Sequence, residues 1–233
     1  MKNNVSINGF RLFGFTDKDN LLAHVAAHKG ILIALNAEKL YRRNSELQRL
    51  SQNGIGYADG AGAVWALKAQ GLKNVTRLPG SELWLDLVEK FAPDSSFYLV
   101  GSTEKVIECV IQKLHSQFPS INIVGFRNGF LQSTDFEGLE KDIVSKQPDV
   151  IFVAQGSPKQ EQLMLSLQAK HPAIYMGLGG SFDVYTGAVR RAPALFRNNG
   201  LEWLYRLISQ PSRIKRQIVL VPFAFRLLLR RFD

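Results

Sequence analysis

Five short clusters of glycine and polar residues directly follow apolar runs of the sequence. If the runs form parallel strands, their carboxyl ends meet at one edge of a sheet, where open α/β sheets bind ligands. The helices that follow point their N-termini to that edge, and glycine lets the backbone approach a ligand closely, an arrangement suited to phosphate. The clusters are Asn36, Asp59 with Gly60, Gly101 with Ser102, Gly156 to Gln160, and Gly179 with Gly180 through Asp183.

Asp59 lies in the sequence YADGAG, after an apolar run and before a flexible turn. A carboxylate there can cap a helix or form an Asx-turn. It can equally act as a general base that deprotonates an attacking hydroxyl. Spacing alone leaves both interpretations open.

The last two clusters resemble nucleotide-binding turns in composition only. In GSPKQE, Pro158 suits a first helical turn, and Lys159 and Gln160 could meet phosphate or sugar hydroxyls, or simply begin a helix. The segment lacks the P-loop pattern, and GLGGSFD lacks the G-x-G-x-x-G spacing. Because this dinucleotide-binding spacing is missing, a NAD-dependent oxidoreductase is disfavoured. Asp183 could accept a hydrogen bond from a ribose or a base, or it could cap a turn.

The sequence predicts no metal site and no cofactor. It contains no Asp-x-Asp pair of the kind that holds a metal against a diphosphate, and Cys109 is its only cysteine. His24 and His28 lie one helical turn apart without an evident third ligand, so a solvated helix face is the preferred interpretation. We expect metal-independent chemistry.

Apolar runs alternate with longer amphipathic segments, which predicts an α/β fold with a Rossmann-like, mostly parallel sheet and flanking helices. Thr103 and Ser81 are expected N-caps. The predicted strands are 31–35, 55–59, 96–102, 121–125, 149–156 and 173–180, and the predicted helices include 37–50, 103–115, 134–146 and 201–209.

The net charge of +9 is concentrated at the C-terminus. Residues 190–233 hold ten basic and two acidic side chains, whereas the rest of the chain is nearly neutral. No stretch has the length of a membrane span or of a signal-peptide core. We expect a cytoplasmic or membrane-peripheral protein with a core at 1–195 and a basic, amphipathic appendage at 196–233.

Three partners suit this appendage. Basic side chains among bulky apolar ones favour an anionic membrane surface, each charge near it contributing about 1 kcal/mol. Burial in a homo-oligomer is the second interpretation. Nucleic acid is the third and is disfavoured, because the segment is rich in apolar residues.

An ordered set of segments resembles the WecG/TagA/CpsF glycosyltransferases, with NAEK and the last segment most similar to the WecG branch. The resemblance runs from about residue 30 to 217. The segments are NAEKL, YADGAGAVWA, VTRLPGSELW, NGF, GSPKQE, MGLGGSFDVYTGAVRRAP and GLEWLYRLISQPSRIKRQ.

The resemblance implies an inverting, metal-independent enzyme at the cytoplasmic face of the bacterial inner membrane. It would transfer N-acetylmannosaminuronic acid from UDP to undecaprenyl-diphosphate-linked GlcNAc, as in enterobacterial common antigen synthesis. Asp59 matches the proposed base, and the appendage would dock on the membrane. Asn36, Arg77, Gln160 and Asp183 match pocket positions, Arg77 being a further catalytic candidate, and Arg206, Arg213 and Arg216 match arginines that meet diphosphates.

One departure from the family pattern concerns the donor. Teichoic-acid members carry Thr-Pro before the asparagine, where this chain has Ala34-Leu35. A UDP-ManNAc or UDP-glucose-type donor in teichoic acid or exopolysaccharide synthesis remains the alternative within the family. A membrane-bound nucleotide-binding protein without catalysis is the alternative from another class.

Overall fold

The computed structural model describes residues 3–132, 134–190, 193, 196, 205 and 218–229. Among these, six strands form the main sheet in the order β4-β3-β8-β7-β5-β6, and β1 and β2 form a separate two-stranded sheet. The pairs β3–β8, β8–β7, β7–β5 and β5–β6 are all parallel. The predicted α/β fold with a parallel sheet is confirmed.

The chain divides into two compact units. The first comprises residues 1–17, 34–79 and 190–233, and the second comprises 18–33 and 80–189. Strand β3 (Gly30–Leu35) belongs to the second unit up to Ile33 and to the first from Ala34. The boundary between core and appendage that the sequence predicts at 195/196 stays a prediction.

The first unit begins with a hairpin that the sequence reasoning missed. Strands β1 (Asn4–Ile7) and β2 (Phe10–Phe13) pair antiparallel around Asn8 and Gly9, which both have positive φ. The buried Asn8 side chain donates to the Leu40 carbonyl (3.0 Å) and accepts from Arg43 (2.7 Å), so the turn is anchored to the helical segment that follows β3.

That helical segment is two helices, where one was predicted over 37–50. Helix α2 (Ala37–Arg42) ends at Arg43, whose φ of 50° is left-handed. Asn44 then caps α3 (Ser45–Asn53) by accepting from the Leu47 N–H (2.9 Å). A new cap directly after a left-handed residue starts a second helix instead of continuing the first. The unit is completed by β4 (Ile55–Ala58), α4 (Ala61–Ala69) and α13 (Leu220–Leu228).

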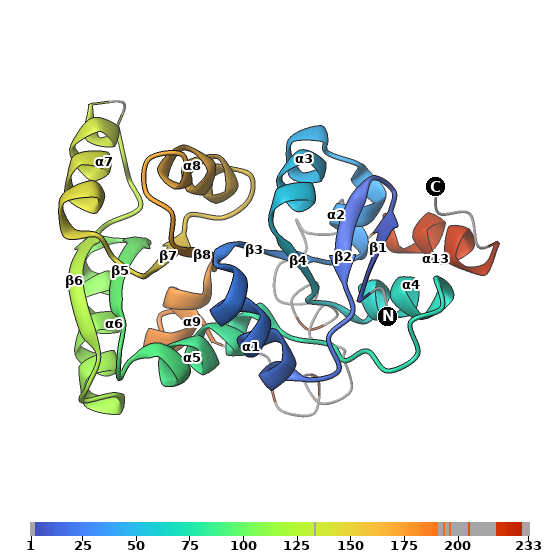
Figure 1. Ribbon diagram of the computed structural model, residues 1–233, viewed down its shortest axis with the longest axis horizontal. Coiled ribbons are helices and arrows are strands. Elements are labelled where there is room, and N and C mark those ends of the chain that lie inside the picture. The colour runs from blue at the N-terminus through green and yellow to red at the C-terminus, as the bar shows by residue number, and fades with distance from the viewer. Residues whose placement is uncertain are drawn as a thin grey trace. The chain divides into compact units, whose positions relative to one another are not determined.

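The second unit places helices on both faces of strands β5 to β8. In Figure 1, α7 and α8 cover one face, and α1, α5, α6 and α9 cover the other. The strands are β5 (Ser96–Gly101), β6 (Asn122–Arg127), β7 (Val150–Ala154) and β8 (Ile174–Gly177). The helices are α1 (Lys18–His28), α5 (Gly80–Phe91), α6 (Glu104–Gln117), α7 (Asp135–Lys146), α8 (Lys159–Gln168) and α9 (Ser181–Thr186).

Aromatic packing fixes α5 and α9 against this sheet. The buried ring of Trp84 makes edge contacts with Phe152 on β7 and with Phe182 and Tyr185 on α9, at centroid distances of 5.1–5.8 Å. Such edge-to-face pairs stabilise beyond the area they bury. The start of α9, which carries Asp183, is thereby held by the core.

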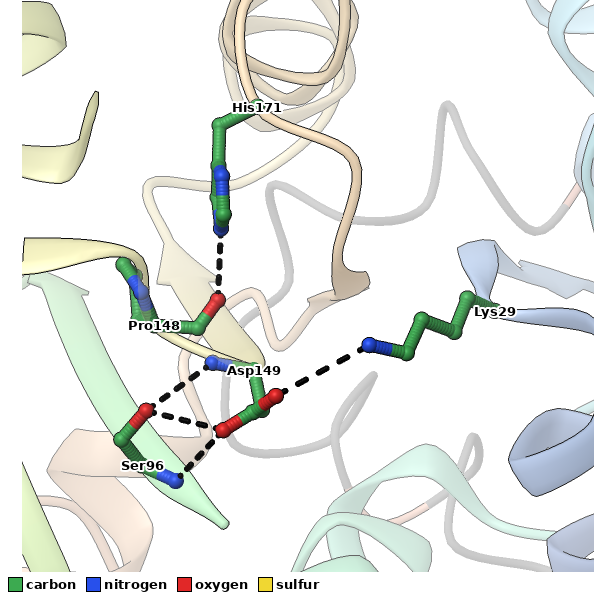
Figure 2. A network of polar contacts seen from close by, with 5 residues as sticks. All are labelled: Lys29, Ser96, Pro148, Asp149 and His171. Carbon is green, nitrogen blue, oxygen red and sulfur yellow. Dashed lines mark hydrogen bonds and ion pairs between the residues drawn. The ribbon is translucent and has the colours of Figure 1, made fainter.

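A polar network joins the amino ends of the strands of the second unit (Figure 2). The Asp149 carboxylate accepts from the Ser96 N–H and Oγ, both at 3.0 Å, and lies 3.8 Å from the Lys29 ammonium. The buried His171 ring contacts the Pro148 carbonyl at 2.7 Å. Burial alone would raise the pKa of Asp149, but the hydrogen bonds from Ser96 and the charges of Lys29 and His171 outweigh it and lower that pKa.

Candidate active site

In the first unit, two predicted site residues lie at the ends of neighbouring strands. Asn36 follows β3 and Asp59 follows β4, and the Asp59 N–H donates to the Leu35 carbonyl (3.0 Å). Gly60 comes so close that a Cβ there would lie 3.4 Å from the Asn36 Cβ. The fold therefore brings Asn36, Asp59 and Gly60 together, with Asp59 partly exposed.

Each of these residues has a local structural role as well. The Asn36 side chain accepts from the Lys39 N–H (3.0 Å) and so caps α2. Gly60 occupies the N-cap position of α4 without a side-chain cap. Helix α4 begins two residues after Asp59.

Arg77 is held beside Asp59 through the backbone. Its Nε donates to the Asp59 carbonyl at 3.1 Å, and the next residue, Leu78, donates its N–H to the Ala58 carbonyl (2.8 Å). Arg77 and Leu78 therefore lie beside the end of β4. This contact brings a guanidinium to the group of Asn36, Asp59 and Gly60.

Tyr57 belongs to the same neighbourhood, and the sequence reasoning did not single it out. Its ring is fully buried, and its hydroxyl has no hydrogen-bond partner among the described residues. Burial, together with the negative charge of Asp59, raises the pKa of Tyr57 well above its ordinary value. Its position two residues before Asp59 in the sequence was the available signal.

In the second unit, Ser102 links the end of β5 to α9. Its Oγ donates to the Asp183 carboxylate at 2.9 Å, and its N–H donates to the Ala154 carbonyl (3.1 Å). Gly101 is required beside it, because its φ is +147° and a Cβ would lie 2.5 Å from the Ala154 oxygen. Gly101, Ser102 and Asp183 therefore form one cluster.

Gln160 connects the loops that follow β7 and β8. Its side-chain oxygen accepts from the Gly156 N–H (3.1 Å) and the Gly179 N–H (2.9 Å), and only 6% of its surface is exposed. Both glycines have positive φ. These two N–H groups are thus engaged within the protein. Lys159, the first residue of α8, is exposed, and Gly180 precedes the first residue of α9.

The sequence model of the Glycosyl transferase WecG/TagA/CpsF family matches residues 5–233, nearly the whole chain. The chain belongs to this family. It is therefore a glycosyltransferase of cell-surface polysaccharide synthesis, with a sugar donor and an acceptor as its substrates. The family resemblance that the sequence motifs indicate is confirmed, whereas the WecG branch within it stays a prediction.

The arginines that this glycosyltransferase was predicted to use for diphosphates, Arg206, Arg213 and Arg216, lie outside the described residues. Most of the helix predicted over 201–209 lies outside them as well. Within the described part of the chain, no three metal-ligating side chains gather around one point. His24 and His28 instead stack their rings at 4.3 Å.

The C-terminal helix α13 packs on the first unit by one face. The Phe223 ring, 2% exposed, would lie 3.2 Å from a Cβ at Gly62, and the Arg226 guanidinium lies 4.7 Å from the Tyr41 ring centroid. The helix includes Pro222 without interruption, because a first-turn residue has no intrahelical N–H bond to lose.

The remainder of α13 in this glycosyltransferase carries exposed apolar side chains at helical spacing. Trp65 on the neighbouring α4 is exposed as well. None of the helices in the described ranges has the length and hydropathy to cross a membrane. The exposed side chains on and beside α13 are Ile218, Val221, Phe225, Leu228 and Leu229.

Proposed function

We propose that this glycosyltransferase moves N-acetylmannosaminuronic acid from a UDP donor to undecaprenyl-diphosphate-linked GlcNAc, with inversion and without a metal. Family membership supports sugar transfer in polysaccharide synthesis. The NAEK and LEWLYRLISQPSRIKRQ segments support the WecG-type reaction. The observation that carries the proposal is the grouping of Asp59 with Asn36, Gly60 and Arg77 where β3 and β4 end.

In the proposed reaction, Asp59 accepts the proton of the GlcNAc 4-hydroxyl. The oxygen of that hydroxyl forms a bond to the anomeric carbon, on the face opposite UDP, while the bond from that carbon to the diphosphate oxygen breaks. UDP leaves with the bonding electrons, and the proton stays on the carboxylate. A partly exposed carboxylate at a strand end, with its backbone fixed by Leu35 and Arg77, suits this task.

The departing diphosphate gains negative charge, which fixed cations and dipoles must stabilise. The Gly156 and Gly179 N–H groups already donate to Gln160, so they are poor candidates for binding this phosphate. We assign the role to side chains of the first unit: Arg77, and Arg206, Arg213 and Arg216 of the appendage. A preorganised donor of this kind contributes roughly 3–4 kcal/mol to the transition state.

We expect the enzyme to bind the lipid-linked acceptor at the membrane surface. Helix α13 supports this proposal, because Val221, Phe225 and Leu228 follow one another at intervals of four and three residues and are all largely exposed. Ten basic residues lie in the same C-terminal segment. An apolar stripe beside positive charge is typical of helices that lie on anionic bilayers. A homo-oligomer is the competing occupant of this surface, and nucleic acid is disfavoured.

The test is a transfer assay with purified full-length protein, a short-chain lipid-diphosphate GlcNAc and a panel of UDP-sugars, run with a chelator and without added metal. We expect the mass of the main product to increase by one N-acetylmannosaminuronic acid. A main product from UDP-ManNAc or UDP-glucose would replace the donor assignment and keep the family. No product from any donor, under conditions where UDP binds, would support the non-catalytic alternative.

A further inference from the structure

One residue of the candidate active site is carried by a very short helix. Asn36 is the N-cap of α2, which has only six residues. Its side chain accepts from the Lys39 N–H and its carbonyl accepts from the Leu40 N–H, both at 3.0 Å. A helix of this length is not stable by itself in water, because the first turn is costly to form. Contacts from outside α2 must therefore fix the position of Asn36.

The turn of the β1–β2 hairpin supplies such a contact through Asn8, which is 2% exposed. The Asn8 side-chain nitrogen donates to the Leu40 carbonyl (3.0 Å), one of the last four carbonyls of α2, which have no partner within an α-helix. The Arg43 guanidinium donates to the Asn8 side-chain oxygen (2.7 Å). Because arginine only donates, this contact leaves the amide nitrogen to face α2. A chain of hydrogen bonds therefore runs from Asn8 through Leu40 to Asn36.

The hairpin turn is itself held by α3, independently of α2. The Gln48 side chain donates to the Asn8 carbonyl (2.6 Å), and the Gln52 side chain donates to the Gly9 carbonyl (2.9 Å). Asn8 has a φ of +50°, in the left-handed region that asparagine and glycine tolerate best. The turn backbone is thus a fixed support, and the Asn8 side chain is the part of it that reaches α2.

We infer that Asn8 is a positioning residue of the sugar transfer. It holds the C-terminal end of α2 so that Asn36, at the other end, keeps its place beside Asp59 and Gly60. The inference rests on the proposed function, because it takes Asn36 to contact a substrate, whereas the buried Asn8 acts only through α2. A shift of about 1 Å in a group that orients a substrate can lower the rate about 100-fold.

The test measures kcat/KM for transfer by the full-length protein, each variant being assayed well below its own unfolding midpoint. Asn8→Asp keeps an acceptor for Arg43 but makes two acceptors face each other at Leu40, and we expect kcat/KM to fall roughly 10- to 100-fold. Asn8→Gly suits the left-handed backbone and removes the whole side chain, so it should show a similar fall. Gln52→Met is the matched control, because it removes one hydrogen bond to the same turn without touching α2; it should stay within about twofold of the unaltered protein.

A double-mutant cycle with Asn36→Ala separates positioning from general stability. If Asn8 acts through Asn36, adding Asn8→Asp to Asn36→Ala lowers kcat/KM by less than about twofold further, because the positioned side chain is already gone. Losses that multiply in the double variant would overturn the inference, and so would Asn8 variants that transfer as fast as Gln52→Met. Both results leave the proposed function intact. Unaltered transfer by Asn36→Ala alone would instead remove Asn36 from the proposed pocket, and this inference with it, so the two failures are distinguishable.

Discussion

At the scale of single residues, Gln160 has a structural role in addition to the pocket position that the family resemblance implies for it. Its side chain holds two loops together. One buried amide oxygen accepts from two backbone N–H groups that lie 4 and 19 residues away in the sequence. A segment such as GSPKQE indicates a helix start, but it cannot reveal the second partner in the loop after β8. The same limit applies to Asp183, whose partner Ser102 lies 81 residues earlier.

Replacing Gln160 by Met keeps the shape of the side chain and removes the acceptor. Two N–H groups then lose their partner, and we expect the free energy of unfolding to fall by about 2 kcal/mol or more. Transfer activity should fall as well, because the two loops would no longer be held. Thermal unfolding and initial transfer rates measure the two effects. Gln162→Met, at an exposed position on α8, is the matched control.

If Gln160→Met unfolds at the same temperature as the Gln162→Met control and transfers sugar at the same rate, Gln160 does not hold these loops.

Capping residues were predictable where the signal was local. Thr103 accepts from the Val106 N–H (3.3 Å) and caps α6, as its sequence position predicts. Ser81 was expected to cap the next helix upstream, but α5 already begins at Gly80, so Ser81 lies inside the first turn. An N-cap and a first-turn residue differ by one position, and small polar residues are common at both.

At the scale of elements, the strands of the parallel sheet were predicted well because each is a short, continuous apolar run. The hairpin of β1 and β2 was missed, although Asn8-Gly9 between apolar residues is a strong signal for a tight hairpin turn. The division of residues 37–50 into α2 and α3 depends on the left-handed backbone conformation of Arg43. An arginine in the sequence does not predict this conformation.

The exposed face of α13 leads to a prediction about membrane binding. Val221→Asp combined with Phe225→Asp places two charges on this face, and we expect partitioning onto vesicles of phosphatidylethanolamine and phosphatidylglycerol to fall about tenfold or more. Co-sedimentation measures it, and binding of the unaltered protein should weaken with added salt. Phe126→Asp is the matched control, an exposed aromatic residue on β6.

Equal vesicle binding by the α13 double variant and the Phe126→Asp control would contradict membrane docking by α13. Loss of self-association in the double variant, with vesicle binding retained, would assign this face to a homo-oligomer.

At the scale of the whole molecule, the two ends of the strands in the second unit have different roles. The Asp149 network joins the amino ends of its strands, and the candidate ligand-binding loops follow the carboxyl ends. The fold class and the family could be predicted from the sequence, because periodicity and ordered motifs are distributed along the chain. The Asp149 network could not, because its members come from segments far apart in the sequence.

The lowered pKa of Asp149 predicts a dependence of stability on pH. A carboxyl group whose pKa is lower in the folded state stabilises the fold above its unfolded pKa of about 3.9, and this contribution is lost as the pH falls through the folded value. In Asp149→Asn, we expect a lower unfolding midpoint at pH 7, by roughly 2–6 °C. The difference from the unaltered protein should shrink between about pH 4 and pH 2.

Thermal unfolding at a series of pH values measures this effect, with the exposed Asp94→Asn as control. A midpoint difference that stays constant down to pH 2 would show that Asp149 stabilises by shape alone.

The central claim is that Asp59 is the base of a sugar transfer, and the single-turnover transfer rate of Asp59→Asn tests it most directly. The substitution keeps the shape of the side chain and removes the proton acceptor. We predict a fall of roughly 10²- to 10⁴-fold in rate, with unfolding midpoint and UDP affinity retained and with Asp94→Asn unaffected. A folded Asp59→Asn protein that transfers sugar within about threefold of the unaltered rate would contradict the account, since the fall expected for a lost general base is far larger.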